Sequence, residues 1–146
     1  MASAGDLHGT WKRLPALAFY KPGPKPESHV RVYEHFAEGL KVSCTEIIEG
    51  KEISWHYTIP AFDGKVYPVY GRNDADGIKA FQLSETEVLG IFIKDGVETA
   101  ICMRELSSDG RTLIVIESGA DDGQGQPYWN TAVFTKQVAP WTSRKL

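Results

Sequence analysis

The sequence is poor in the features that define metal, membrane and nucleic-acid proteins. Its 146 residues include two cysteines, Cys44 and Cys102, and neither has a Cys-x-x-Cys partner or a histidine at metal-binding spacing. No apolar run approaches the ~18 residues of a membrane-spanning helix. The net charge of -3 provides no basic surface for phosphates. We therefore expect no metal site, no membrane insertion and no nucleic-acid partner.

The amino terminus also lacks the features of a targeting signal. Residues 1–6 contain neither the basic region nor the apolar region of a secretory signal. Two cysteines inside predicted strands are typical of buried, reduced thiols. These observations predict a cytoplasmic protein. The chain length fits one hydrophobic core, so we expect residues 1–146 to form a single domain.

Helical periodicity is missing as well, and turn signals replace it. Acidic-glycine pairs recur every 11 to 19 residues, at Glu38-Gly39, Glu49-Gly50, Asp63-Gly64, Asp76-Gly77, Asp95-Gly96, Asp109-Gly110 and Asp122-Gly123. Glycine supplies the positive φ that tight hairpins require. The segments between these turns alternate apolar and polar residues, as strands do. The predicted strands are 9–14, 28–36, 40–48, 52–59, 65–70, 78–83, 87–94, 97–106, 111–118 and 127–136.

Consecutive strands joined by hairpins pair antiparallel, and a long open sheet of them would leave two bare edges. Closing the sheet removes both edges. The predicted fold is therefore all-β: a single up-and-down antiparallel barrel of eight to ten strands with little or no helix.

The interval between the first two predicted strands is rich in proline. Three prolines in residues 22–26 exclude a helix or a central strand there. We expect residues 15–20 to form an extended connector with at most one helical turn. Its apolar residues Leu17, Phe19 and Tyr20 would either cap one mouth of the barrel or cover a sheet edge.

The segment Gly9-Thr10-Trp11-Lys12 opens the first strand. Glycine permits close approach of a second backbone, and a tryptophan can fill the narrow end of a barrel. We expect Trp11 to plug that end; the alternative is a surface tryptophan.

This opening resembles the Gly-x-Trp start of the calycin superfamily, which comprises lipocalins and intracellular lipid-binding proteins. Met103-Arg104-Glu105-Leu106, followed by Asp109-Gly110, is similar to a late hairpin of the lipid-binding proteins. Residues 131–136 resemble their closing strand. The resemblance implies a barrel that holds a hydrophobic ligand, with Arg104 in a ligand-anchoring position. The chain lacks room for the family's two-helix lid, and Ala132 and Phe134 replace the family's second arginine and its tyrosine, which favours an apolar or aromatic ligand.

Alternate residues of a barrel strand face the interior. If Arg104 points inward, Cys102 does too, and Tyr128, Asn130 and Phe134 share one face of the closing strand. A buried guanidinium requires a partner. We expect Arg104 to pair with Glu98, Glu117 or Glu46, or to receive an anionic or carbonyl group of a ligand. Trp55 belongs to an aromatic set that would line a pocket or fill the core.

The function predicted from these residues is the binding of a small hydrophobic or aromatic molecule in the central cavity. The candidate ligand-binding residues are Trp11, Trp55, Cys102, Arg104, Glu117, Tyr128, Asn130 and Phe134. The alternative is a cofactor-independent isomerase or cyclase acting on a natural-product-like substrate, with His56, Tyr57 or Glu46 moving one proton. Either function predicts a small-molecule partner and no cofactor, in a monomer or homodimer.

Overall fold

The computed structural model describes residues 7–23, 25–121 and 125–138. These contain ten strands: β1 (Gly9–Lys21), β2 (Ser28–Phe36), β3 (Gly39–Ile48), β4 (Lys51–Ile59), β5 (Tyr67–Tyr70), β6 (Gly77–Gln82), β7 (Glu87–Lys94), β8 (Val97–Leu106), β9 (Thr112–Gly119) and β10 (Tyr128–Lys136). Each strand pairs antiparallel with the next, and β1 pairs with β10 to close the barrel. The predicted all-β up-and-down barrel is confirmed.

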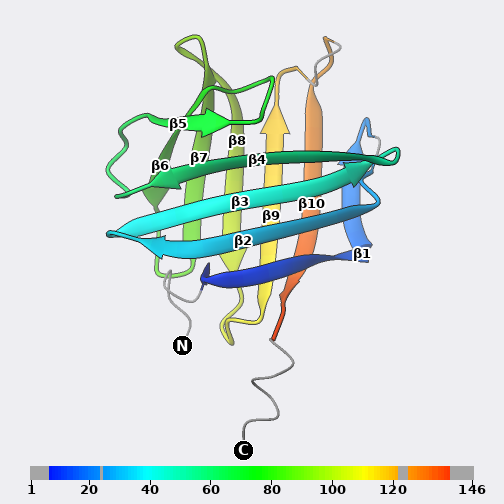
Figure 1. Ribbon diagram of the computed structural model, residues 1–146, viewed down its shortest axis with the longest axis horizontal. Coiled ribbons are helices and arrows are strands. Elements are labelled where there is room, and N and C mark those ends of the chain that lie inside the picture. Colours follow the sequence, from blue (N-terminus) through cyan, green and yellow to red (C-terminus); the bar gives the residue numbers. More distant parts are fainter. Residues whose placement is uncertain (1–6, 24, 122–124, 139–146) are drawn as a thin grey trace, which may run out of the picture.

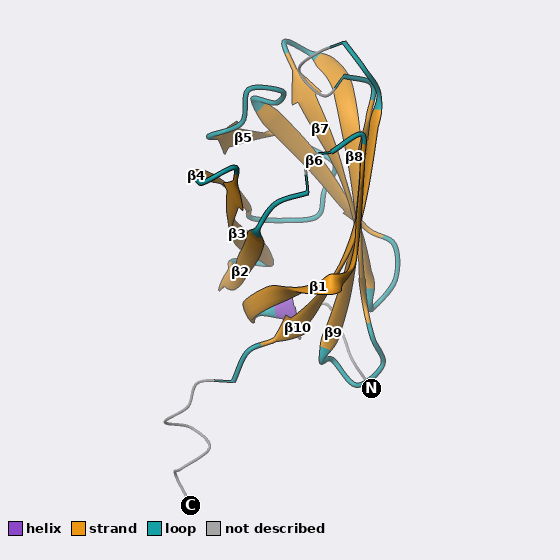
Figure 2. Ribbon diagram, turned by 90° about the vertical axis from the view of Figure 1, so that its right-hand side faces the viewer, coloured by secondary structure: helices purple, strands orange, loops and turns teal. Residues whose placement is uncertain are grey.

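The barrel is flattened into two layers. Strands β2, β3 and β4 cross in front of β8, β9 and β10 (Figure 1), and the turned view shows β2 to β4 on one side and β7 and β8 on the other (Figure 2). Orthogonal packing of this kind places the inward side chains of both layers in one shared interior.

The hairpins form where the acidic-glycine pairs predict them. In the β7–β8 turn both Asp95 and Gly96 have positive φ, of 51° and 81°. A two-residue turn with this geometry matches the twist of the strands it joins. The predicted turn at Asp122-Gly123 lies outside the described residues. So do residues 1–6, where no targeting signal was predicted.

The first strand is longer than predicted. It continues past residue 14 to Lys21, and Ala18 to Lys21 pair with β10. The pairing register shifts between Arg13 and Ala18, so Pro15 stands where no ladder hydrogen bond is needed. The predicted connector over 15–20 is therefore the second half of β1. Its Phe19 faces outward, whereas Tyr20 lines the interior cavity.

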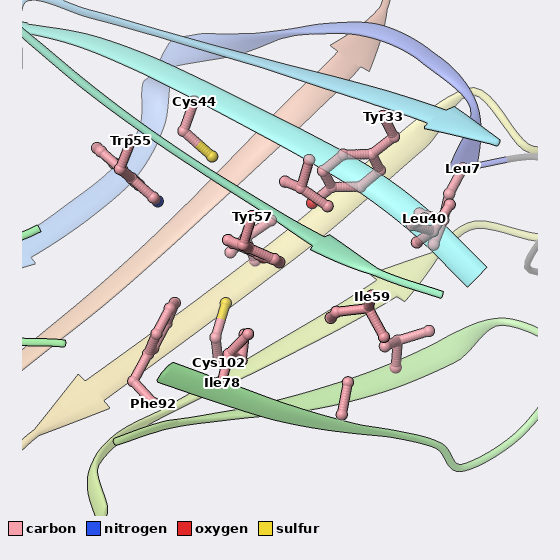
Figure 3. Close-up of a cluster of buried hydrophobic side chains, with 14 of the residues drawn as sticks. Leu7, Tyr33, Leu40, Cys44, Trp55, Tyr57, Ile59, Ile78, Phe92 and Cys102 are labelled. Carbon is pink, nitrogen blue, oxygen red and sulfur yellow. The ribbon is translucent and has the colours of Figure 1, made fainter. Parts of the chain in front are cut away.

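One end of the barrel is filled by apolar side chains. Trp11 is fully buried there, and its indole Nε1 donates a hydrogen bond to the Leu7 carbonyl at 2.7 Å. Leu7, Leu40 and Ile59 lie together at this end, while Trp55 lies toward the other (Figure 3). Trp11 thus closes the barrel as the sequence predicts.

Both cysteines are free and buried. Burial raises the pKa of the Cys44 thiol to about 11, so the thiol stays protonated at neutral pH. Within the described ranges, no three His, Cys, Asp or Glu side chains are placed to hold a metal ion. No helix in the described part of the chain has the length and apolarity needed to cross a membrane.

Candidate functional site

The end of the barrel opposite Trp11 contains a cavity of about 740 Å³. The loops that follow β1, β5 and β9 contribute to its wall, together with the adjoining ends of β7 and β8 and side chains of β2, β3, β4, β9 and β10. Its aromatic wall residues are Tyr20, Trp55, Tyr128 and Phe134. This volume falls in the range of small-molecule sites.

Arg72, in the loop after β5, lines the cavity and links this loop to β9. Its guanidinium donates to both carboxylate oxygens of Asp74, at 2.8 and 2.7 Å, and to both of Glu117, at 3.2 and 2.8 Å. It also lies 4.1 Å from the centre of the Phe92 ring. Tyr128 donates its hydroxyl proton to Glu117 at 2.6 Å. The hydrogen bonds of this guanidinium are satisfied, so it forms a rigid polar wall.

The charge of Glu117 follows from this network. Burial by itself raises the pKa of the carboxyl, but the Arg72 charge and the hydrogen bonds from Arg72 and Tyr128 bring the net pKa below its ordinary value. Glu117 is therefore an anion at neutral pH and is already fully engaged.

Glu46 on β3 has the opposite environment. Its carboxyl lines the cavity, and the described residues offer it no hydrogen bond or ion pair. Burial, followed by the negative charge of Glu117, raises the pKa of Glu46 to about 7. Two carboxyl groups in one cavity are thus held in different states, an arrangement that separates acid from base roles in many sites.

His29 on β2 is a neutral, buried imidazole. It lies between Phe134 and Trp55, at centroid distances of 4.9 and 5.8 Å. Burial and the nearby positive charges, above all that of Arg31, hold the pKa of His29 well below its usual range. Neither of its ring nitrogens, nor Nε1 of Trp55, has a hydrogen-bond partner among the described residues. The cavity wall therefore holds buried donors and one acceptor that a ligand could satisfy.

Positive charge surrounds this neutral imidazole. Arg31 Nε donates to the Tyr33 hydroxyl at 2.9 Å, and Arg13 donates to the Pro26 carbonyl at 2.7 Å. Both guanidiniums are buried, and neither forms an ion pair with a carboxylate of the described residues. Buried charges without a counter-charge attract electron-rich groups, so this part of the cavity favours an anion or a hydrogen-bond acceptor.

The sequence-predicted residues separate into three groups in the structure. Those that line the cavity are Glu46, Trp55, Glu117, Tyr128, Asn130 and Phe134. Those buried in the core outside the cavity are Trp11, at the closed end, and Tyr57, Cys102 and Arg104. His56 lies on the outer surface of β4 and stacks on Tyr70 at a centroid distance of 5.2 Å. Their functional roles stay predictions.

Arg104 differs from its expected surroundings. Its guanidinium donates to the Tyr57 hydroxyl, not to a carboxylate. Of the predicted partners, Glu98 is exposed and pairs with Lys79 at 2.7 Å, and Glu117 is held by Arg72. A phenol oxygen accepts the hydrogen bond without adding a second buried charge.

Arg13, His29, Arg31 and Arg72 carry no sequence motif that marks them as site residues. In β2 the alternation is plain, but both faces carry large residues, with His29, Arg31 and Tyr33 on one and the valines on the other. The alternation therefore predicts a strand but does not indicate which of its two faces points into the barrel. Arg72 lies in a loop, where periodicity carries no information. Its signal is the Arg-x-Asp spacing that forms the ion pair with Asp74.

Of the comparisons with known proteins, only the one with solved structures bears on the fold. No protein-family model and no curated protein sequence matches the chain. Zebrafish ileal bile acid-binding protein, solved with cholic acid, is similar over 90% of this chain and 99% of its own, at 9% identity and a TM-score of 0.52. The siderocalin Ex-FABP is similar over 95% of this chain and 80% of its own, at 11% identity and a TM-score of 0.40.

The chain shares the closed antiparallel β-barrel fold of the bile acid-binding protein. At such low identity the likeness extends to architecture only, since one fold serves many functions. The sequence-based resemblance to calycins is confirmed at the level of the fold. In place of a two-helix lid, a short proline-rich loop joins β1 to β2.

Proposed function

We propose that the protein binds a small, mainly apolar or aromatic molecule in the barrel cavity. The aromatic wall of Tyr20, Trp55 and Phe134 would contact the apolar body of the ligand. A polar end of the ligand, an anion or a hydrogen-bond acceptor, would lie near Arg31 and His29.

A single observation carries this proposal. A cavity of about 740 Å³ is walled by side chains whose buried nitrogens, on His29 and Trp55, have no partner among the described residues. A buried unsatisfied polar group costs ~1–3 kcal/mol, and a bound ligand that satisfies it gains that free energy back.

Native mass spectrometry of the protein purified from its source cells tests the proposal. We expect an added mass of a few hundred daltons in the wild type, and the loss of that mass in Asn130→Phe, which places a ring in the cavity. Equal occupancy in both forms would contradict binding at this site. Extraction of the retained molecule would identify its chemistry.

Glu46 favours proton transfer as a second candidate function. Of the three proposed acid or base residues it alone lines the cavity, and its pKa is about 7. A group that titrates near neutrality can both accept and return a proton. This is the step that a cofactor-independent isomerase or cyclase would require.

A generic carbon acid, 5-nitrobenzisoxazole, tests this second candidate. The base takes the proton of the ring C–H bond. The electron pair of that bond completes a nitrile, while the N–O bond breaks and its electrons stay on oxygen as a phenolate. We expect wild-type turnover to rise with pH around pH 7 and to be lost in Glu46→Gln. Glu52→Gln, which changes an exposed carboxylate of β4, should keep the wild-type rate. Equal rates in the two variants would exclude Glu46 as the base.

A cytoplasmic location belongs to the same proposal. It is supported by the two free, buried cysteines, which fit a reducing compartment. Fractionation of the source cells checks it, and recovery outside the cytoplasm would contradict it.

A further inference from the structure

A continuous apolar row crosses the outside of the barrel. Reading the strand registers from β6 through β10 to β1, side chains that lie directly beside one another are Phe81, Leu89, Met103, Ile116, Thr131 and Phe19. None of the six carries a charge. The row spans six strands and five of the ten strand pairings of the barrel.

The rows on either side extend this surface. One contains Ile91, Ile101, Ser118 and Trp129, and the other contains Ile114 and Val133. Ile101 is 48% exposed, Trp129 52% and Phe19 54%. We call the three rows the outer face. In Figure 2, β2 to β4 lie on one side of β7 and β8, and the outer face is on the other.

The charged residues of the outer face lie toward the ends of the two flanking rows, and they are of both signs. Lys79 and Lys21 end one row, and Glu87 and Glu105 end another. An anionic lipid surface would select lysine or arginine at such a margin. The presence of both lysine and glutamate does not fit an anionic lipid surface. It suits a protein partner that also carries charges of both signs.

The area of the outer face matches the need of a protein partner. Six strands about 4.8 Å apart cover about 24 Å, and three rows of side chains cover about 20 Å along the strands, or roughly 500 Å² before side-chain relief is counted. Two such faces bury about 1,000 Å² in total, which is the lower size of a specific interface.

We propose that two copies of this chain pair through the outer face. Two sheets pack face to face about 10 Å apart with interdigitated side chains, and an apolar face without central charges is complementary to itself. Met103 and Ile116 lie at the centre of the contact. The cavity opens at the end of the barrel, so pairing leaves its mouth accessible.

Sedimentation velocity of the full chain over a range of concentrations tests the pairing. We expect a species of twice the 16.2 kDa chain mass, about 32 kDa. Ile116→Lys places a charge at the centre of the face and should raise the dimer dissociation constant about 100-fold, as loss of a central contact does. Met103→Lys is a second variant at the same centre. Ser54→Lys, on the outside of β4, is the matched control and should leave the dimer unchanged.

Circular dichroism shows whether the variants fold. A wild-type chain that stays at the monomer mass at 100 μM overturns the proposal. So does an Ile116→Lys chain that is folded and still dimeric. Binding of a wild-type monomer to phosphatidylcholine vesicles would assign the outer face to a lipid surface and overturn it as well.

Discussion

At the residue scale, Arg72 is the side chain on which the cavity wall depends most. It forms ion pairs with both Glu117 and Asp74 while packing on Phe92. Removing one partner of a buried ion pair leaves the other charged and unpaired, which is more costly than the pair's own net contribution.

We therefore expect Arg72→Met to lower the free energy of unfolding by roughly 3 kcal/mol or more. Lys79→Met removes the more exposed pair with Glu98 and should cost about 1 kcal/mol or less. Urea unfolding of both variants measures the difference. Equal losses would show that burial of the Arg72 pair does not matter.

Glu46 determines whether its contribution to the stability of the fold rises or falls with pH. In the unfolded chain its carboxyl has the ordinary pKa of 4.5, and in the fold burial raises this to about 7. The folded state binds the proton more tightly, so the contribution is fully present below pH 4.5 and is lost as the pH rises toward 7. The loss amounts to at most about 3 kcal/mol.

Unfolding at pH 5 and pH 8 tests this assignment. The wild type should lose stability between the two values relative to Glu46→Gln, because glutamine does not titrate. If the stability of both proteins changed with pH in the same way, the Glu46 carboxyl would be exposed to water in the folded state, and its pKa would not be raised.

At the element scale, turn chemistry and alternation predicted most strand positions to within two residues. The glycine-containing turns set the boundaries, and period-two patterns set the faces of β8 and β10, where Arg104 and Phe134 point inward. The end of β1 was predicted wrongly, because Pro15 was expected to end the strand. The register shift between Arg13 and Ala18 lets the strand continue past this proline. Sequence reasoning also failed for Arg31, because both faces of β2 carry large side chains.

Gly71 tests how β5 is held against β4. Its φ is +91°, and an added Cβ would lie 2.3 Å from the Ser54 carbonyl oxygen. Gly50 has φ of +78° with open space around it. We expect Gly71→Ala to cost more than about 2 kcal/mol and Gly50→Ala about 1 kcal/mol, since only the first adds a clash to the backbone strain. Thermal unfolding of the two variants measures their losses of stability. Equal losses would mean that the backbone at Gly71 can move away from β4 without a loss of stability.

At the scale of the whole molecule, closure of ten strands produces one sealed end and one open end. Trp11 and its apolar neighbours fill the first, and the loops after β1 and β5 leave a cavity at the second. Strands β2–β4 cross β8–β10 and do not lie along them (Figure 1), and side chains of both layers line the cavity.

Titration with anilinonaphthalene sulfonate, an aromatic anion, tests cavity binding most directly. We expect saturable binding of one probe per chain in the wild type, and at least a tenfold weaker affinity in Ala132→Trp, whose ring would occupy the cavity. Ser54→Trp adds the same ring on the outer surface and should bind like the wild type. Undiminished binding by a folded Ala132→Trp protein would contradict a ligand site inside the barrel.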